Sequence, residues 1–218
     1  MSETKKGVIL VDDHPLVRDS LSRLINHEPD LAMYGEAENA ESALKIIREK
    51  SPSLAIVDIT LKHSNGLELI KTIKAEHPEL PVLVLSMHDE SLYAERALRA
   101  GATGYITKHQ PADEVLLAIR RVISGDVYLS EKLTSGYLKS LLASGPKMAL
   151  PTVDRLTDRE LEVLGFIGRG MTVREIATEL HLGIPTVETY RARIKDKLDL
   201  KNGAELQHFA FRWVRERE

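Results

Sequence analysis

The stretch Val8-Ile9-Leu10-Val11-Asp12-Asp13 decides the fold, because four consecutive apolar residues end on a pair of carboxylates. Two later stretches repeat this arrangement: residues 54–57 (LAIV) end on Asp58, and residues 82–85 (VLVL) end on Ser86. Short apolar runs of this kind are typical of strands that are buried on both faces, as in a parallel sheet covered by helices. The sequence therefore predicts an α/β domain in the first part of the chain.

Two weaker candidate strands, residues 32–35 (AMYG) and 104–107 (GYIT), bring the predicted number of strands to five. Between the strands, apolar residues recur with helical period, at Val17, Leu21, Leu24 and Ile25 and again at Val115, Ile119 and Val122. This alternation predicts a (βα)5 doubly wound parallel sheet.

Composition limits the class of protein. The chain has 218 residues, of which 43% are hydrophobic, and this is enough for two modest packed domains. Its apolar runs fall short of the ~20 residues of a spanning helix, and its first residues do not resemble a signal peptide, so we expect no membrane association and a cytoplasmic location. The absence of cysteine excludes disulfides and thiolate chemistry. A net charge of -3 argues against indiscriminate coating of nucleic acid.

The alternation of strands and helices stops near Gly125, and the pattern becomes helical beyond Pro151. We predict a first domain over residues 1–125, a linker over 126–150 and a small all-α domain over 151–218. An amphipathic helix is expected from 130 to 142 within the linker. In the all-α domain, Thr157 with Glu160 and Thr172 with Glu175 are capping boxes that predict helix starts, and Asn202 with Glu205 has the same spacing.

Polar residues follow the apolar strands at the same relative position: Asp12 and Asp13, Asp58, Ser86 and Lys108. Each alone could be a helix cap or a solvated loop residue. Because the carboxyl ends of parallel strands line one crevice, we expect these side chains to converge. Carboxylates at ~4 Å repel by about 4 kcal/mol per pair at an effective dielectric near 20, so a cation must offset them. The hard cation Mg2+ fits oxygen ligands, and Lys108 adds positive charge.

A carboxylate can act as a nucleophile toward a phosphoryl group, and the assistance it needs is mostly electrostatic. The predicted cation and Lys108 would supply this assistance. Ser86 offers a hydroxyl donor to a phosphoryl oxygen, and Tyr105 is a candidate to report on movement of Ser86.

Residues 7–125 resemble the receiver domain of two-component response regulators, through Val-Asp-Asp-His-Pro at 11–15, Asp58 with Gly66, Leu85-Ser86, and Ala-Gly-Ala-Thr-Gly-Tyr-Ile-Thr-Lys at 100–108. The resemblance implies that a sensor histidine kinase phosphorylates Asp58. It also implies that Asp13, Asp58 and the Thr60 carbonyl hold Mg2+, with help from Asp12. By the same resemblance, Ser86 and Tyr105 form a switch pair, and Lys108 binds the phosphoryl group. Lys62 departs from the family pattern, which usually has proline there, and Thr60 and His88 occupy variable positions.

In the C-terminal part, Ile176, Ala177 and Leu180 give one short helix a buried stripe, and a turn at 181–183 leads to a second helix, which is helix-turn-helix spacing. In the second helix, we expect Val187, Tyr190, Ile194 and Leu198 to face inward. We expect Glu188, Thr189, Ala192 and Arg193 to face outward, with Arg191 and Lys195 at the flanks. An isolated basic run is usually a solvated face, but basic residues beside small ones here suit contact with DNA. Glu188 could accept from a cytosine amino group or favour the positive helix N-terminus.

Residues 151–215 resemble the LuxR-type DNA-binding domain, through Leu-Thr-Asp-Arg-Glu at 156–160, Glu-Val-Leu at 162–164, Glu-Ile-Ala at 175–177, Thr186-Val187 and Lys197-Leu198. Together the two halves resemble NarL/FixJ-class transcriptional regulators. The residues predicted to contact double-stranded DNA are Thr172, Thr186, Glu188, Thr189, Arg191, Ala192, Arg193 and Lys195. The last helix has an apolar stripe that we expect to lie mostly in the core, at Leu206, Phe209, Ala210 and Trp213. The resemblance implies that this helix also pairs two DNA-binding domains in a homodimer. Gly183 and Tyr190 replace the Ser and His that are common in the family.

The sequence favours a transcriptional regulator without enzymatic activity, and two alternative functions stay open. Haloacid-dehalogenase-like phosphatases also use a strand-end aspartate, but they need a second aspartate two residues later, where this chain has Thr60. A pseudo-receiver, whose crevice only binds protein, would not need all five residues of the phosphoacceptor chemistry.

Overall fold

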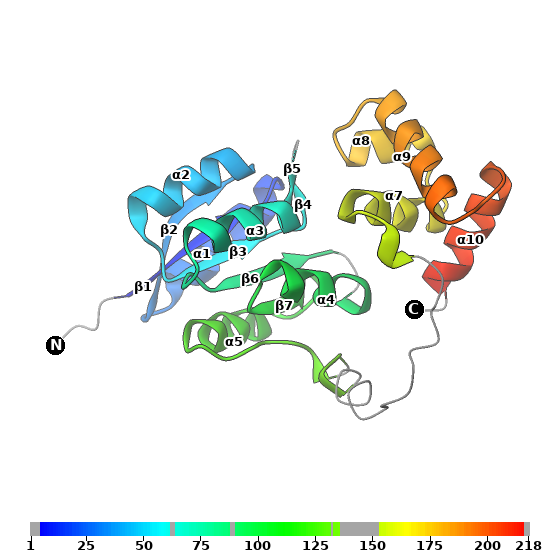
Figure 1. Cartoon of the computed structure of the whole chain (residues 1–218). Coiled ribbons are helices and arrows are strands. Elements are labelled where there is room, and N and C mark those ends of the chain that lie inside the picture. Colours follow the sequence, from blue (N-terminus) through cyan, green and yellow to red (C-terminus); the bar gives the residue numbers. More distant parts are fainter. Residues whose placement is uncertain (1–4, 62–63, 88–89, 132, 136–152, 216–218) are drawn as a thin grey trace. The chain divides into compact units, whose positions relative to one another are not determined.

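The computed structural model describes residues 5–61, 64–87, 90–131, 133–135 and 153–215. The chain divides into two compact units, Met1–Ala143 and Ser144–Glu218, and each is described by itself. In Figure 1 the first unit runs from blue to green and the second from yellow to red.

The first unit contains a five-stranded parallel sheet, which confirms the predicted fold class. Its strands are β1 (Lys6–Val11), β2 (Leu31–Ala37), β3 (Leu54–Val57), β6 (Val82–Ser86) and β7 (Gly104–Thr107), in the order β2-β1-β3-β6-β7. Both weaker candidate strands are present. The strand predicted at 32–35 is longer than expected, because β2 pairs with β1 along its length, from Lys6 opposite Leu31 to Val11 opposite Ala37.

Five helices surround the sheet: α1 (Pro15–His27), α2 (Ala40–Lys50), α3 (Gly66–Glu76), α4 (Glu90–Ala100) and α5 (Ala112–Ile123). Alternate strand residues such as Val8 and Leu10 belong to one core cluster with Ile25 of α1 and Val115 and Ile119 of α5. Side chains alternate across a strand, so the opposite face is left for α2, α3 and α4, which follow one another in contact. In Figure 1, α2 and α3 lie on one side of the strands and α5 on the other.

A short antiparallel hairpin, β4 (Thr60–Leu61) with β5 (Ser64–Asn65), connects β3 to α3 and was not predicted from the sequence. Gly66 follows it, and its N–H donates to the carbonyl of Ile59 at 2.7 Å. A Cβ on Gly66 would lie only 1.9 Å from the carbonyl oxygen of Asp58. Glycine is therefore required for this connection to pass so close to Asp58.

The second unit consists of a 3-10 turn (Val153–Arg155) and the helices α7 (Asp158–Gly168), α8 (Val173–Glu179), α9 (Ile184–Lys197) and α10 (Gly203–Arg215). Both predicted capping boxes are present, at the start of α7 and of α8. The side chain of Asn202 accepts from the N–H of Glu205 at 2.9 Å, so this cap is also confirmed.

Two buried glutamates tie the helices of this unit together. The carboxylate of Glu160 on α7 lies 2.6 Å from the Nζ of Lys197 at the end of α9. Arg159 pairs with the buried Glu162 at 2.6 Å and also donates to the carbonyl of Leu180, which ends α8. These contacts fix α8 and α9 on α7 in addition to the apolar core.

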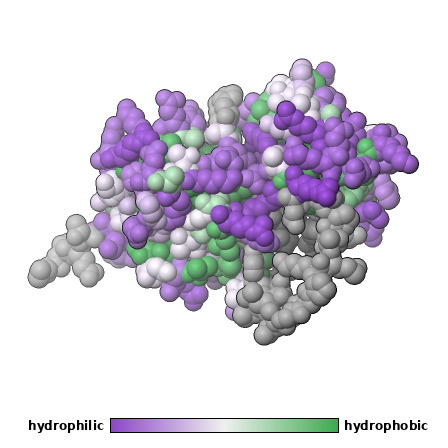
Figure 2. Space-filling view, viewed as in Figure 1, coloured by the Kyte–Doolittle hydropathy of each residue, from purple (hydrophilic) through white to green (hydrophobic). Residues whose placement is uncertain are grey.

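The helix predicted over 130–142 lies largely outside the described residues, of which 131 and 133–135 are helical. Within the described part of the chain, no helix has the length and apolar character needed to cross a membrane. Figure 2 shows a face that is mostly hydrophilic, with apolar side chains in small groups.

Candidate functional site

Three strand-end carboxylates meet at the carboxyl edge of the sheet. β1 and β3 are neighbours with Val11 opposite Val57, so the residues that follow them, Asp12 and Asp58, lie side by side. Asp12 is fully buried and Asp58 is 3% exposed. Oxygens of Asp12, Asp13 and Asp58, together with a ring nitrogen of His14, lie within 4.8 Å of one another. This is a group of side chains that could hold a metal ion.

Lys108 reaches this group from the end of β7. Its Nζ lies 2.6 Å from Asp12 Oδ2 and 2.6 Å from Asp58 Oδ2, and its side chain is only 6% exposed. Burial lowers the pKa of Lys108, but the charges of Asp58 and Asp12 and their hydrogen bonds more than offset this and raise it above its ordinary value. Lys108 is therefore a fixed positive charge between two carboxylates, which confirms the predicted convergence of the strand-end residues.

His14 and Arg18 also contact the site, and the sequence reasoning missed both. The N–H of His14 donates to Asp12 Oδ1 at 2.9 Å, and its Nδ1 lies 2.8 Å from Asp13 Oδ1. Arg18 donates to the carbonyl oxygen of Asp12 at 2.6 Å. The position of His14 directly after the acidic pair was an available signal. Arg18 lies one helical turn beyond His14, so it lies over the same strand end.

Ser86 and Tyr105 lie together inside the unit. Ser86 ends β6, and β7 runs beside it with Tyr105 opposite Val84. Both side chains are fully buried. Burial raises the pKa of Tyr105 well above its ordinary value, and a hydrogen bond from Ser86 acts in the opposite direction. Tyr105 thus packs inward against the predicted switch partner Ser86.

Thr60 lies next to Asp58 in the β4–β5 hairpin, and its N–H is 3.4 Å from Asp58 Oδ1. Lys62, which departs from the family pattern, and His88, which occupies a variable position, lie outside the described residues.

In the second unit, α9 presents the predicted surface. Of the predicted DNA-contacting residues, those that are exposed are Thr172, Thr186, Glu188, Thr189, Ala192 and Arg193, and those that are partly exposed are Arg191 and Lys195. Val187, Ile194 and Leu198 are buried as expected, whereas Tyr190 is only half-buried. The hydroxyl of Thr189 donates to the carbonyl of Pro185 at 2.9 Å. The period of the apolar residues thus placed the polar face of α9 correctly.

Of the two interpretations of Glu188, the one in which its carboxylate stabilises the positive N-terminus of α9 is wrong. α9 begins at Ile184 and has no acidic residue in its first turn, beyond which a helix dipole acts weakly. Glu188 instead lies 2.8 Å from Arg191, one turn along the exposed face.

Comparison with known proteins agrees with both halves of this description. Residues 8–120 match the response regulator receiver domain family, and residues 154–210 match the bacterial regulatory proteins of the luxR family. A protein from Pseudomonas aeruginosa is 37% identical over 205 residues, which are 94% of this chain and 97% of the relative. The oxygen regulatory protein NreC of Staphylococcus aureus is 32% identical over 209 residues, 94% of this chain and 96% of the relative.

Among solved structures, the chain is similar to a LuxR-family two-component response regulator from Aurantimonas sp. SI85-9A1, with 32% sequence identity and a TM-score of 0.59. The superposition covers 64% of this chain and 99% of that chain. The segment that matches the receiver family contains the carboxylate site with Lys108, and the segment that matches the luxR family contains the helix-turn-helix. The chain therefore belongs to the NarL/FixJ class of response regulators, transcriptional regulators that join a receiver domain to a LuxR-type DNA-binding domain.

Proposed function

We propose that Asp58 accepts a phosphoryl group from a sensor histidine kinase and that this changes DNA binding by the second unit. The observation that carries the proposal is the position of the Asp58 carboxylate, beside Asp12 and Asp13 and 2.6 Å from the Lys108 ammonium. A carboxylate in this setting has the electrostatic support that phosphoryl transfer needs.

The donor set fits Mg2+, because three carboxylates lie within reach of one hard cation. We propose Asp12, Asp13, Asp58 and the carbonyl oxygen of Thr60 as the groups that would hold it. When bound, Mg2+ would neutralise charge on the phosphoryl oxygens.

The residues of this chain supply the remaining chemistry. A carboxylate oxygen of Asp58 forms a bond to phosphorus, while the bond from phosphorus to the imidazole nitrogen of the kinase histidine breaks and its electron pair returns to that nitrogen. Lys108 neutralises the phosphoryl oxygens from its position beside Asp58. The Ser86 hydroxyl donates to one of them, which moves Ser86 relative to Tyr105.

For DNA, we propose that α9 enters the major groove. Arg191, Arg193 and Lys195 would contact phosphates, while the small exposed side chains Thr189 and Ala192 allow close approach to base edges. Thr172 at the start of α8 and Thr186 near the start of α9 would complete the contacts, and Glu188 would read a cytosine amino group. A homodimer would bind two half-sites about one helical turn apart.

We further propose that the receiver occupies residues 1–125 and the DNA-binding domain residues 151–218, with a linker over 126–150. The two domain families match within these limits, at 8–120 and 154–210.

Incubation of the full chain with acetyl phosphate and Mg2+ tests the phosphoacceptor. One phosphoryl mass should appear in the wild type and be lost in Asp58→Ala, while Asp19→Ala, at an exposed aspartate of α1, should keep it. Continuous release of phosphate without an accumulating adduct would instead favour a haloacid-dehalogenase-like phosphatase. An unmodified wild type would favour the pseudo-receiver.

Salt titration of DNA affinity tests the interface on α9. Arg191→Ala should weaken binding and reduce the slope of log affinity against log salt by about 0.9, the value for one phosphate contact. Lys71→Ala removes one positive charge from the exposed surface of α3 and should leave the slope unchanged. Equal slopes for Arg191→Ala and the wild type would contradict the placement of Arg191 at a phosphate.

A further inference from the structure

The segment that leaves α5 pairs with the edge of the receiver sheet. β7 is the last strand in the sheet order, and Tyr128 forms a parallel bridge with Gly104. The N–H of Tyr128 donates to the carbonyl of Thr103 at 3.2 Å, and the N–H of Tyr105 donates to the carbonyl of Tyr128 at 2.9 Å. The chain beyond α5 therefore returns to β7 before it leaves the receiver.

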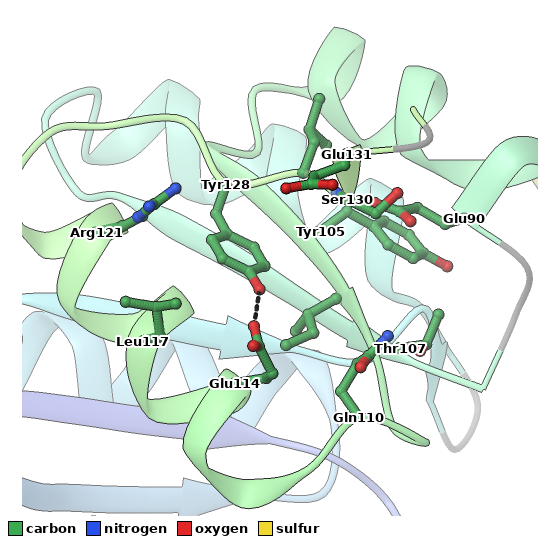
Figure 3. Close-up of a pocket in the computed structure, with 12 residues that line it drawn as sticks. Glu90, Tyr105, Thr107, Gln110, Glu114, Leu117, Arg121, Tyr128, Ser130 and Glu131 are labelled. Atoms are coloured by element: carbon green, nitrogen blue, oxygen red, sulfur yellow. Dashed lines mark hydrogen bonds between the residues drawn. The ribbon is translucent and has the colours of Figure 1, made fainter. Parts of the chain in front are cut away.

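Two glutamates hold the same segment from either side. The hydroxyl of Tyr128 donates to Glu114 on α5 at 2.8 Å, which is the dashed bond in Figure 3. The N–H of Ser130 donates to Glu90, the first residue of α4, also at 2.8 Å. Residues 127–131, with these contacts, are called the clip from here on.

The clip fits closely against the sheet. The ring of Tyr128 packs on the receiver core cluster, and burial together with Glu114 raises the pKa of Tyr128 to about 12. A Cβ on Gly104 would lie 3.0 Å from the carbonyl oxygen of Tyr128. The glycine in β7 therefore leaves room for the clip backbone.

The clip contacts β7, which carries Tyr105, and α4, which follows the strand β6 that ends at Ser86. Its backbone accepts from the amide of Tyr105, and Glu90 lies four positions after Ser86 at the start of α4. The side chains of Tyr105 and Glu90 line one cavity of about 340 Å³ with Tyr128 and Ser130. Figure 3 shows Tyr105, Glu90 and Ser130 close together on one side of this cavity. Tyr105 therefore contacts the clip directly through its amide, and Glu90 contacts it from the start of α4.

We propose that the clip is an intramolecular docking site through which the state of Ser86 and Tyr105 controls the linker and hence the DNA-binding domain. The inference rests on the proposed function and identifies the connection that it leaves open. Hydrogen bonds at a partly exposed edge contribute modestly, so the docked and undocked arrangements can be close in free energy. A small preference of the phosphorylated receiver for one arrangement then shifts the population.

The double variant Glu90→Ala/Tyr128→Phe removes both side-chain anchors without touching Asp58, Ser86 or Lys108. The matched control is Glu90→Gln/Glu114→Gln, because each glutamine keeps an oxygen acceptor for the N–H of Ser130 or the hydroxyl of Tyr128. Both are made in the full chain and modified with acetyl phosphate and Mg2+.

Hydrogen exchange at the amides of Tyr105 and Ser130 is the first measurement. Without acetyl phosphate, we expect exchange about tenfold faster in Glu90→Ala/Tyr128→Phe than in the wild type, and wild-type rates in the glutamine control. Phosphorylation should change these rates in the wild type. Equal rates in the wild type and the double variant, or no effect of phosphorylation in the wild type, would overturn the inference.

The ratio of DNA affinities with and without phosphorylation is the second measurement. In the wild type and in the glutamine control, we expect phosphorylation to change the DNA affinity by about fivefold or more, as is usual for allosteric coupling. The ratio should fall to within about twofold of one in Glu90→Ala/Tyr128→Phe, with phosphoryl uptake unchanged. Retention of the wild-type ratio would overturn the inference while leaving the proposed function intact. Absence of phosphoryl uptake in the wild type would instead contradict the proposed function, and the exchange comparison without acetyl phosphate would still test the clip.

Discussion

Replacement of Lys108 by methionine should destabilise the receiver unit, because it removes the cation between two buried carboxylates and keeps the length and apolar stem of the side chain. Lys108 Nζ lies 2.6 Å from oxygens of both Asp12 and Asp58. All three side chains are at most 6% exposed, so water cannot replace the lost charge without rearrangement.

The expected magnitude follows from these distances. At 2.6 Å and an effective dielectric near 20, each contact of Lys108 contributes about 6 kcal/mol of Coulomb attraction, most of which is offset by the desolvation of the charges. Removal of one partner from a buried ion pair costs about 3–5 kcal/mol, and we expect a loss in this range near pH 8 without divalent cations. Added Mg2+ should recover more stability in Lys108→Met than in the wild type, because the variant carboxylates have lost their competing cation.

Urea unfolding of the full chain measures this loss. Trp213 is the only tryptophan and lies in the second unit, whereas tyrosine fluorescence includes the buried Tyr93 and Tyr105 of the first unit. The tyrosine transition should move to lower urea, and the tryptophan transition should stay in place as an internal control.

The dependence on pH gives a second check on Lys108. Its pKa in the folded protein is raised above the ordinary value of 10.5, so its contribution to stability is fully present below pH 10.5 and is lost as the pH rises through the folded pKa. The difference in stability between the wild type and Lys108→Met should therefore be constant from about pH 8 to 10 and shrink above 10.5. Equal urea midpoints at pH 8 without Mg2+ would refute the reasoning.

Three further substitutions test the remaining features. Gly66→Ala should destabilise the receiver by at least the value of about 1–3 kcal/mol that is typical of overpacking and abolish phosphoryl uptake, because the added Cβ would lie 1.9 Å from the carbonyl oxygen of Asp58. The control Gly165→Ala should be tolerated, because its Cβ would have nothing within 4 Å. A stable Gly66→Ala variant that takes up phosphoryl groups like the wild type would contradict the prediction. Thr157→Ala removes the cap of α7 and should lower the stability of the second unit by about 1 kcal/mol, measured by the tryptophan transition in urea. Glu188→Ala should relax specificity at one base pair if Glu188 reads a cytosine; a uniform gain in affinity for all sequences in a binding-site selection would show that it only repels phosphates.

The local parts of the structure were predictable from the sequence. Apolar tetrads ending in Asp58 or Ser86 predicted the strands and the polar residues at their carboxyl ends, since burial on both faces leaves a signal in consecutive residues. The capping boxes at Thr157 and Thr172 and the exposed face of α9 were also correct, because a cap or a helical face is encoded within about four residues.

The convergence of Asp58 and Lys108 was predicted, but their direct ion pair could not be, because it depends on which strands are neighbours. These residues lie 50 positions apart, and they pair because β3, β6 and β7 are consecutive in the sheet. By contrast, the pair of Glu188 with Arg191 is an i,i+3 contact on one helix, so its spacing was already present in the sequence.

The sequence by itself thus determined the class of each domain and the residue types at the phosphoacceptor site, because apolar periodicity and strand-end polarity are properties of short segments. Only the tertiary structure decided that Lys108 bridges Asp12 and Asp58 and that Tyr128 docks on β7. The physical reason is that a backbone pairing at a sheet edge uses N–H and carbonyl groups common to every residue, so the side-chain pattern of residues 127–131 carries no trace of it.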